Sequence, residues 1–187
     1  MKLGIIILLL IVGLASCQPQ IAAPTSSSPI KNVEMLKSAD TSEIETSNVD
    51  YGPAAGFLAK PKKEGIYPGI VMIHEWWGLN ENIKEMAKQL AAEGYVVLAV
   101  DMFEGKVGQN ATEAREFSTK VRENPAKAIE NLKAAVQFLK TQDNVNQDLI
   151  ASMGWCFGGQ WSLQLALNEK LSATVIYYGS LETNATK

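Results

Sequence analysis

The stretch GWCFGG, residues 154–159, follows the apolar run LIASM, residues 149–153, and precedes a segment with helical character. It has the form Gly-x-Cys-x-Gly, with Cys156 two residues from both Gly154 and Gly158. A tight strand-to-helix turn forces its central residue into unfavourable backbone angles, and the flanking positions must then lack side chains to avoid collision. The pattern predicts that Cys156 is a presented nucleophile. The competing interpretation is an inert core cysteine beside glycines needed for packing.

Strand and helix signals alternate along the chain from Val49 onward. Short continuous apolar runs, typical of strands buried on both faces, are YPGIVMIHE (67–75), YVVLAVDMF (95–103), DLIASMGW (148–155) and SATVIYYGS (172–180). Apolar residues recur at helical spacing over residues 83–91 and 128–139. The Gly- and Pro-containing stretch at residues 51–61 predicts edge strands or a hairpin. The fold class predicted is three-layer α/β, a mostly parallel sheet covered by helices.

Polar and aromatic segments follow directly after the predicted buried strands, where the carboxyl ends of parallel strands meet at one edge of a sheet. They are HEWWG (74–78), DMFEG (101–105), GWCFGG (154–159) and YYGSLE (177–182). The first N–H groups of the helix after Cys156 favour a thiolate over a thiol. The N–H of Phe157 and, by position, the N–H of Trp76 are predicted to form an oxyanion hole.

Two of these segments carry a resemblance to a known family. MIHEWWGLNENIKEMAKQLAAEGYVVLAVDMF (72–103) together with GWCFGG resembles the dienelactone hydrolase family, α/β-hydrolases with a cysteine nucleophile. The resemblance implies hydrolysis of small-molecule esters or lactones without a cofactor or metal, with Cys156 as nucleophile and Glu75 contacting the thiol at rest. A solvated loop carboxylate is the alternative for Glu75. The family uses Cys, Asp and His in that chain order, so His74 is expected to be structural and not the base.

The sequence departs from the family pattern in its later part. No Asp occurs after Asp148 and no His after His74, so the resemblance predicts an incomplete triad within a truncated domain over residues 49–187, its last strands missing. After DMF the nearest cation is Lys106, where relatives acting on dienelactone carry an arginine. The 187-residue chain alone is therefore expected to be nearly inactive. The alternative function is a non-catalytic, membrane-anchored lipoprotein that binds a ligand or partner.

The first 48 residues predict export and anchoring. Residues 1–17 combine Lys2, an apolar stretch and small residues before Cys17, which is a secretory signal too short to span a bilayer comfortably. Its ending, Leu-Ala-Ser-Cys, resembles a bacterial lipobox, in which Cys17 is lipidated. This predicts an exported lipoprotein on the periplasmic or cell-surface face; a soluble secreted protein is the alternative. Residues 18–48, rich in Ser, Thr and Pro, predict a flexible tether.

Composition excludes one class of partner. The formal net charge is −3, and Lys and Arg do not gather into a stripe, so the electrostatic footprint of a nucleic-acid-binding protein is missing. The hydrophobic fraction of 47% is sufficient for one globular domain with a sizeable core. The sequence thus predicts one α/β domain with a small-molecule substrate.

Overall fold

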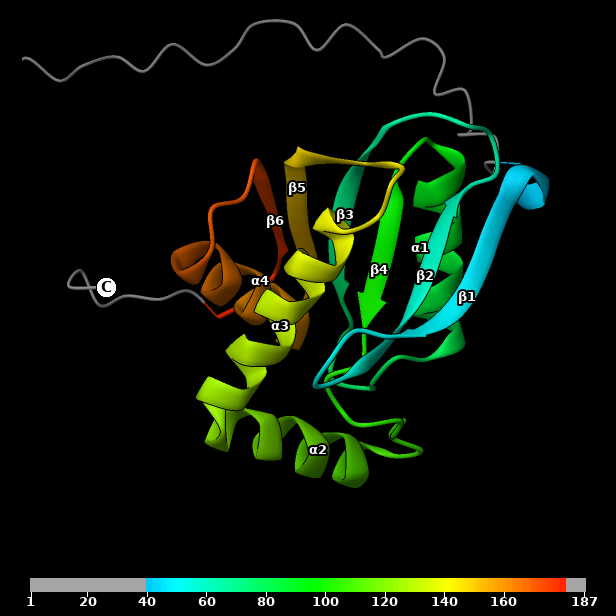
Figure 1. Ribbon diagram of the computed structural model, residues 1–187. Coiled ribbons are helices and arrows are strands. Elements are labelled where there is room, and N and C mark those ends of the chain that lie inside the picture. Colours follow the sequence, from blue (N-terminus) through cyan, green and yellow to red (C-terminus); the bar gives the residue numbers. More distant parts are fainter. Residues whose placement is uncertain (1–39, 181–187) are drawn as a thin grey trace, which may run out of the picture. The chain divides into compact units, whose positions relative to one another are not determined.

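The computed structural model describes residues 40–180, which form one twisted six-stranded sheet flanked by helices (Figure 1). The strands are β1 (Ile44–Asp50), β2 (Ala55–Pro61), β3 (Tyr67–Ile73), β4 (Val96–Val100), β5 (Val145–Trp155) and β6 (Ala173–Tyr177). The helices are α1 (Glu81–Ala92), α2 (Ala111–Glu123), α3 (Pro125–Lys140) and α4 (Phe157–Asn168), and a 3₁₀ turn covers Thr41–Glu43.

The sheet has the order β1-β2-β4-β3-β5-β6. Strands β4, β3, β5 and β6 run parallel, while β2 is antiparallel to both β1 and β4. Each parallel connection crosses over through a helix, as a right-twisted sheet requires. The predicted fold class, a three-layer α/β-hydrolase fold with a mostly parallel sheet, is confirmed.

The hairpin at the start of the domain corrects one predicted boundary. Residues 51–61 are predicted to hold edge strands or a hairpin; they hold β2, which lies between β1 and β4 and forms a hairpin with β1, the edge strand, which already begins at Ile44. Ile44 pairs with Pro61, and both Ile44 and Val49 pack against core clusters. The last residues of the predicted tether over 18–48 therefore belong to the sheet. The predicted signal over residues 1–17, with Cys17, lies outside the described residues.

Helices cover both faces of the sheet (Figure 1). Helix α1 packs on β2 and β4, while α3 and α4 pack on the opposite face, over β3 and β5. Strand β4 is buried along its whole length between these layers, which explains why its sequence is continuously apolar. Within residues 40–180, no helix is both long and apolar enough to cross a membrane.

Helix α2 has only a weak apolar pattern in the sequence. Its buried residues are Ala114 and Ser118, with Phe117 and Val121 partly buried against the core. Asn110 begins the helix because its side-chain oxygen accepts the N–H groups of Thr112 and Glu113. A short apolar face and a polar remainder give little periodic signal, so this helix was not predicted.

Candidate active site

The carboxyl ends of the parallel strands lie in register at one edge of the sheet. Ile73, the last residue of β3, pairs with Val100 of β4 and with Gly154 of β5. Gly154 in turn pairs with Ile176 of β6. The segments that follow all four strands therefore start at the same edge, and the sequence-predicted Glu75, Trp76 and Cys156 are brought to it.

Cys156 occupies a strained turn between β5 and α4. Its backbone angles are φ 53° and ψ −115°, a combination that L-residues rarely adopt. The Cys156 N–H donates to the carbonyl oxygen of Tyr177 at 3.0 Å, which joins the turn to the end of β6. Cys156 is a half-buried free thiol, and α4 begins at the next residue. Backbone strain of this kind concentrates at functional sites.

Gly154 and Gly158 are required by close backbone contacts. A Cβ on Gly154 would lie 2.3 Å from the carbonyl oxygen of Gly158, and a Cβ on Gly158 would lie 2.3 Å from the carbonyl oxygen of Ile73. Neither contact is possible for a real side chain, and backbone atoms cannot turn aside. The two glycines thus let α4 start directly against the ends of β3 and β5. The sequence predicts that both positions must lack a side chain, and the close backbone contacts give the steric reason.

The two predicted oxyanion donors have different local settings. Phe157 is the first residue of α4, so its N–H has no acceptor within the helix, and no side chain caps this helix. Trp76 lies in the turn after β3, where the Gly78 N–H donates to the carbonyl oxygen of Glu75. Among residues 40–180, no acceptor receives the N–H of Trp76. Both N–H groups are thus free to bind an anion.

Glu75 is held by a residue from the end of β6. The Tyr178 hydroxyl donates to Glu75 Oε1 at 2.6 Å across the carboxyl edge of the sheet. The hydrogen bond to Glu75, with the nearby charges of Glu75 and Cys156, raises the pKa of the Tyr178 hydroxyl above its ordinary value. The sequence drew attention to the YYGSLE segment at this edge but assigned no role to Tyr178. The signal that could have pointed to Tyr178 is its position directly after a predicted strand and before Gly179.

His74 is enclosed in the core and bonded on both sides of its ring. It is 0% exposed; Nε2 accepts the N–H of Met102 at 3.1 Å, so Nδ1 carries the proton and donates to the Glu75 carbonyl oxygen. Burial lowers the pKa of His74, which favours the neutral ring. The ring stacks on Phe157 and meets the edge of Phe103. These contacts fit the expected structural role, since neither ring nitrogen is available to a substrate.

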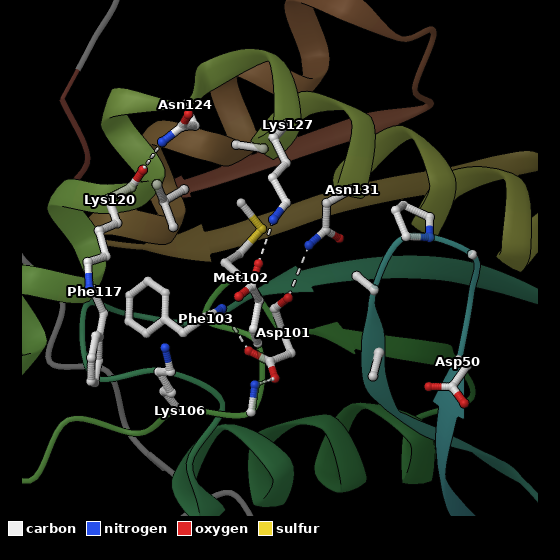
Figure 2. A pocket seen from close by; sticks show the side chains of 18 residues that line it. Asp50, Asp101, Met102, Phe103, Lys106, Phe117, Lys120, Asn124, Lys127 and Asn131 are labelled. Carbon is white, nitrogen blue, oxygen red and sulfur yellow. Dashed lines mark hydrogen bonds and ion pairs between the residues drawn. The ribbon is translucent and has the colours of Figure 1, made fainter.

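A pocket of about 740 Å³ opens beside the loop that follows β4 (Figure 2). Its walls come from the β1–β2 turn, the loop after β4, and helices α2 and α3. Lys106, the cation nearest to DMF in the sequence, lines this pocket with its Nζ 5.7 Å from the centre of the Phe117 ring. Neither of the two predicted catalytic side chains lines the pocket.

The polar groups of this pocket mostly bind one another (Figure 2). The Asp101 carboxylate accepts the N–H groups of Phe103 and Gly105, and its carbonyl oxygen accepts the side-chain amide of Asn131. Tyr51 donates to Asn131 at 2.7 Å, and burial raises the pKa of Tyr51. The carboxylate of Asp101 and the side-chain amide of Asn131 are thus bound within the protein. Within residues 40–180, no group of three His, Cys, Asp or Glu side chains is arranged to hold a metal ion.

Comparison with known proteins agrees with this geometry. The sequence profile of the Dienelactone hydrolase family matches residues 54–187. The chain belongs to the dienelactone hydrolase family. It is 37% identical over 130 residues to Protein usf of Aquifex pyrophilus, and 32% identical over 130 residues to a protein of Aquifex aeolicus named as a carboxymethylenebutenolidase. Each match covers 66% of this chain and 55% of the relative, so the chain spans about half the length of these relatives.

Solved structures agree with the fold. A dienelactone hydrolase-like promiscuous phosphotriesterase from metagenomic libraries superposes with a TM-score of 0.70 at 30% identity, covering 76% of this chain and 62% of that one. Membership of the dienelactone hydrolase family supports a hydrolase. The α/β-hydrolase fold is therefore established.

Proposed function

We propose that the protein is a hydrolase of small-molecule esters or lactones that uses Cys156 as its nucleophile. The observation that carries the proposal is the backbone of Cys156, φ 53°, on a strand-to-helix turn whose flanking glycines admit no side chain. An inert core cysteine would not need this strained conformation. Relatives named as carboxymethylenebutenolidases and as a lactonase support an ester or lactone as the substrate class.

The chemistry proposed is acyl transfer to sulfur. The Cys156 thiolate attacks the acyl carbon, and the carbonyl oxygen gains negative charge that the N–H groups of Phe157 and Trp76 bind. The intermediate collapses with cleavage of the acyl C–O bond, and the alcohol oxygen leaves with the bonding electron pair and takes a proton. Water then hydrolyses the thioester and frees the thiol. Glu75 modulates the protonation of the thiol before substrate arrives.

We propose that no histidine within residues 40–180 serves Cys156 as a general base. His74 is the only histidine of the sequence, and its two ring nitrogens are bonded within the core. Loss of a general base costs on the order of 10²–10⁴ in rate. We therefore expect the 187-residue chain to acylate with an activated ester but to turn over very slowly.

The test is the acylation of the chain by p-nitrophenyl acetate, whose leaving group needs no general acid. Intact-mass spectrometry is expected to show one acetyl group, and mass spectrometry of the tryptic peptides is expected to place it on the peptide that contains Cys156, with release of about one equivalent of p-nitrophenolate. Cys156→Ser is the matched control, and its acylation should fall by roughly 100-fold or more because a neutral hydroxyl without a base is a poor nucleophile. Equal labelling of both proteins would contradict the proposal.

Export and anchoring form a separate part of the proposal. The Leu-Ala-Ser-Cys ending of residues 14–17 supports cleavage before Cys17 and lipidation of its thiol, with the domain on the periplasmic or cell-surface face. Cys17→Ala should release the protein from the membrane fraction of the source cell, and the mass of the membrane form should include acyl chains. Continued membrane association of Cys17→Ala would refute the lipid anchor.

A second candidate function is a non-catalytic binding lipoprotein. The pocket of about 740 Å³ favours it, because this volume fits a small ligand and Cys156 is not among the residues that line it. Acylation experiments separate the two functions: a chain whose Cys156 labels no faster with p-nitrophenyl acetate than free cysteine supports the binding function.

A further inference from the structure

Tyr178 has an unusual conformation that its neighbours impose. Its φ is 38°, one of three non-glycine residues with positive φ among residues 40–180; another is Cys156. On one side, the Tyr177 carbonyl oxygen accepts the Cys156 N–H at 3.0 Å. On the other, a Cβ on Gly179 would lie 2.6 Å from the backbone nitrogen of Gln160. The backbone of Tyr178 is thus fixed at both ends to the turn that holds Cys156.

The same conformation brings the Tyr178 side chain to Glu75. The residue is 70% exposed, so burial does not account for its strained backbone. Its recorded polar contact is the hydroxyl hydrogen bond to Glu75 Oε1 at 2.6 Å, which links residues 103 positions apart in the chain. Tyr177, the adjacent residue, instead stacks flat on Trp155 with ring centres 5.4 Å apart. Strain without a packing benefit points to a functional contact.

We infer that Tyr178 is a positioning residue that holds the Glu75 carboxylate and, through it, sets the thiolate fraction of Cys156. The inference rests on the proposed function, in which Glu75 modulates the thiol. The Tyr178 hydroxyl occupies Glu75 Oε1 and donates to it. Among residues 40–180 no hydrogen bond joins Glu75 to the Cys156 thiol, so Glu75 acts on the thiol through its charge, and the Tyr178 donor compensates part of that charge.

Loss of the Tyr178 hydroxyl should lower the thiolate fraction of Cys156. A carboxylate without its tyrosine donor attracts the thiol proton more strongly and repels a thiolate more strongly. The titratable and charged groups around this edge come from several elements. Glu75 follows β3 directly after His74, whose Nδ1 donates to the Glu75 carbonyl oxygen. Cys156 follows β5, Tyr178 follows β6, and the guanidinium carbon of Arg122 in α2 lies 5.3 Å from the centre of the Phe157 ring. Tyr178→Phe removes the hydroxyl that donates to Glu75 and leaves the other groups of this edge in place.

The experiment measures the rate at which iodoacetamide alkylates Cys156 in the full chain between pH 6 and 9. Mass spectrometry of the tryptic peptide spanning residues 141–170 reports Cys156 separately from Cys17. Tyr178→Phe is expected to slow alkylation by about three- to tenfold on the acidic side of the profile and to move its midpoint to higher pH. Tyr177→Phe, the matched control, should stay within about twofold of the parent, since its ring keeps the stack on Trp155.

A double-mutant cycle separates positioning from a general structural effect. Glu75→Gln removes the negative charge, so adding Tyr178→Phe to it should change the rate by less than about twofold. The inference is overturned if Tyr178→Phe changes the alkylation rate no more than Tyr177→Phe does. It is also overturned if Tyr178→Phe slows alkylation as much in the Glu75→Gln variant as in the parent chain. Alkylation requires no ester turnover, so either result can be told apart from a failure of the proposed hydrolase activity.

Discussion

The loops after β4 and β5 leave the same edge of the sheet, yet they use their hydrogen-bonding groups in opposite ways. Each contains a non-glycine residue with positive φ, Glu104 at 56° and Cys156 at 53°. In the β4 loop, the Asp101 carboxylate accepts two backbone N–H groups of its own loop. After β5, helix α4 starts without any side-chain cap. A loop that binds its own donors is structural, whereas one that leaves them free is able to bind an anion.

Gly158→Ala tests the largest difference between the two loops. The new Cβ would lie 2.3 Å from the Ile73 carbonyl oxygen, so we expect the free energy of unfolding to fall by at least about 3 kcal/mol. The control in the β4 loop is Gly105→Ala, with φ 81° and no atom within 4 Å of its Cβ, and it should cost about 1 kcal/mol. Urea unfolding measures both, and equal losses would show that close packing does not distinguish the loops.

Removing the central side chain of each loop gives the next largest difference. Asp101→Ala leaves the N–H groups of Phe103 and Gly105 without their acceptor, one of these bonds being buried, and should cost about 2 kcal/mol. Cys156→Ala should cost less than about 1 kcal/mol, because among residues 40–180 the Cys156 thiol has no recorded hydrogen bond. Thermal or urea unfolding of the two variants measures this. A larger loss for Cys156→Ala would mean that the thiol is a structural group.

His74 joins the segment after β3 to the loop after β4 and gives the domain a pH dependence. It bonds the Met102 N–H on one side and the Glu75 carbonyl oxygen on the other. Burial lowers its pKa in the folded protein below the ordinary value of 6.5. Its contribution to stability is therefore complete above pH 6.5. As the pH falls below 6.5, only the unfolded chain takes up the proton, and the free energy of unfolding decreases by up to about 1.4 kcal/mol per pH unit.

The measurement is urea unfolding at pH 7.5, 6.0 and 5.5 for the parent chain and for His74→Gln. The variant loses the titrating ring, so its decrease in stability between pH 7.5 and 5.5 should be smaller than that of the parent. An identical decrease in both proteins would mean that other groups cause the whole pH effect and that His74 is protonated in the folded state.

Much of the fold could be predicted because strand β4 and its neighbours are continuously apolar and alternate with helical periodicity. The start of β1 at Ile44 was missed, since its burial pattern is mostly exposed and its residues resemble a polar tether. Helix α2 was missed for the same reason. Elements at an edge of the domain bury little apolar surface, so the sequence carries only a weak signal for them.

The sequence by itself determined the α/β class, the Gly-x-Cys-x-Gly turn and the need for Gly154 and Gly158, because these depend on local periodicity and on the absence of a Cβ at fixed spacing. Only the tertiary structure decided which residues meet at the carboxyl edge. The contact of Tyr178 with Glu75 joins the ends of β3 and β6, and the enclosure of His74 depends on the loop after β4. Such contacts arise from the parallel register of strands distant in the chain, which local sequence does not encode.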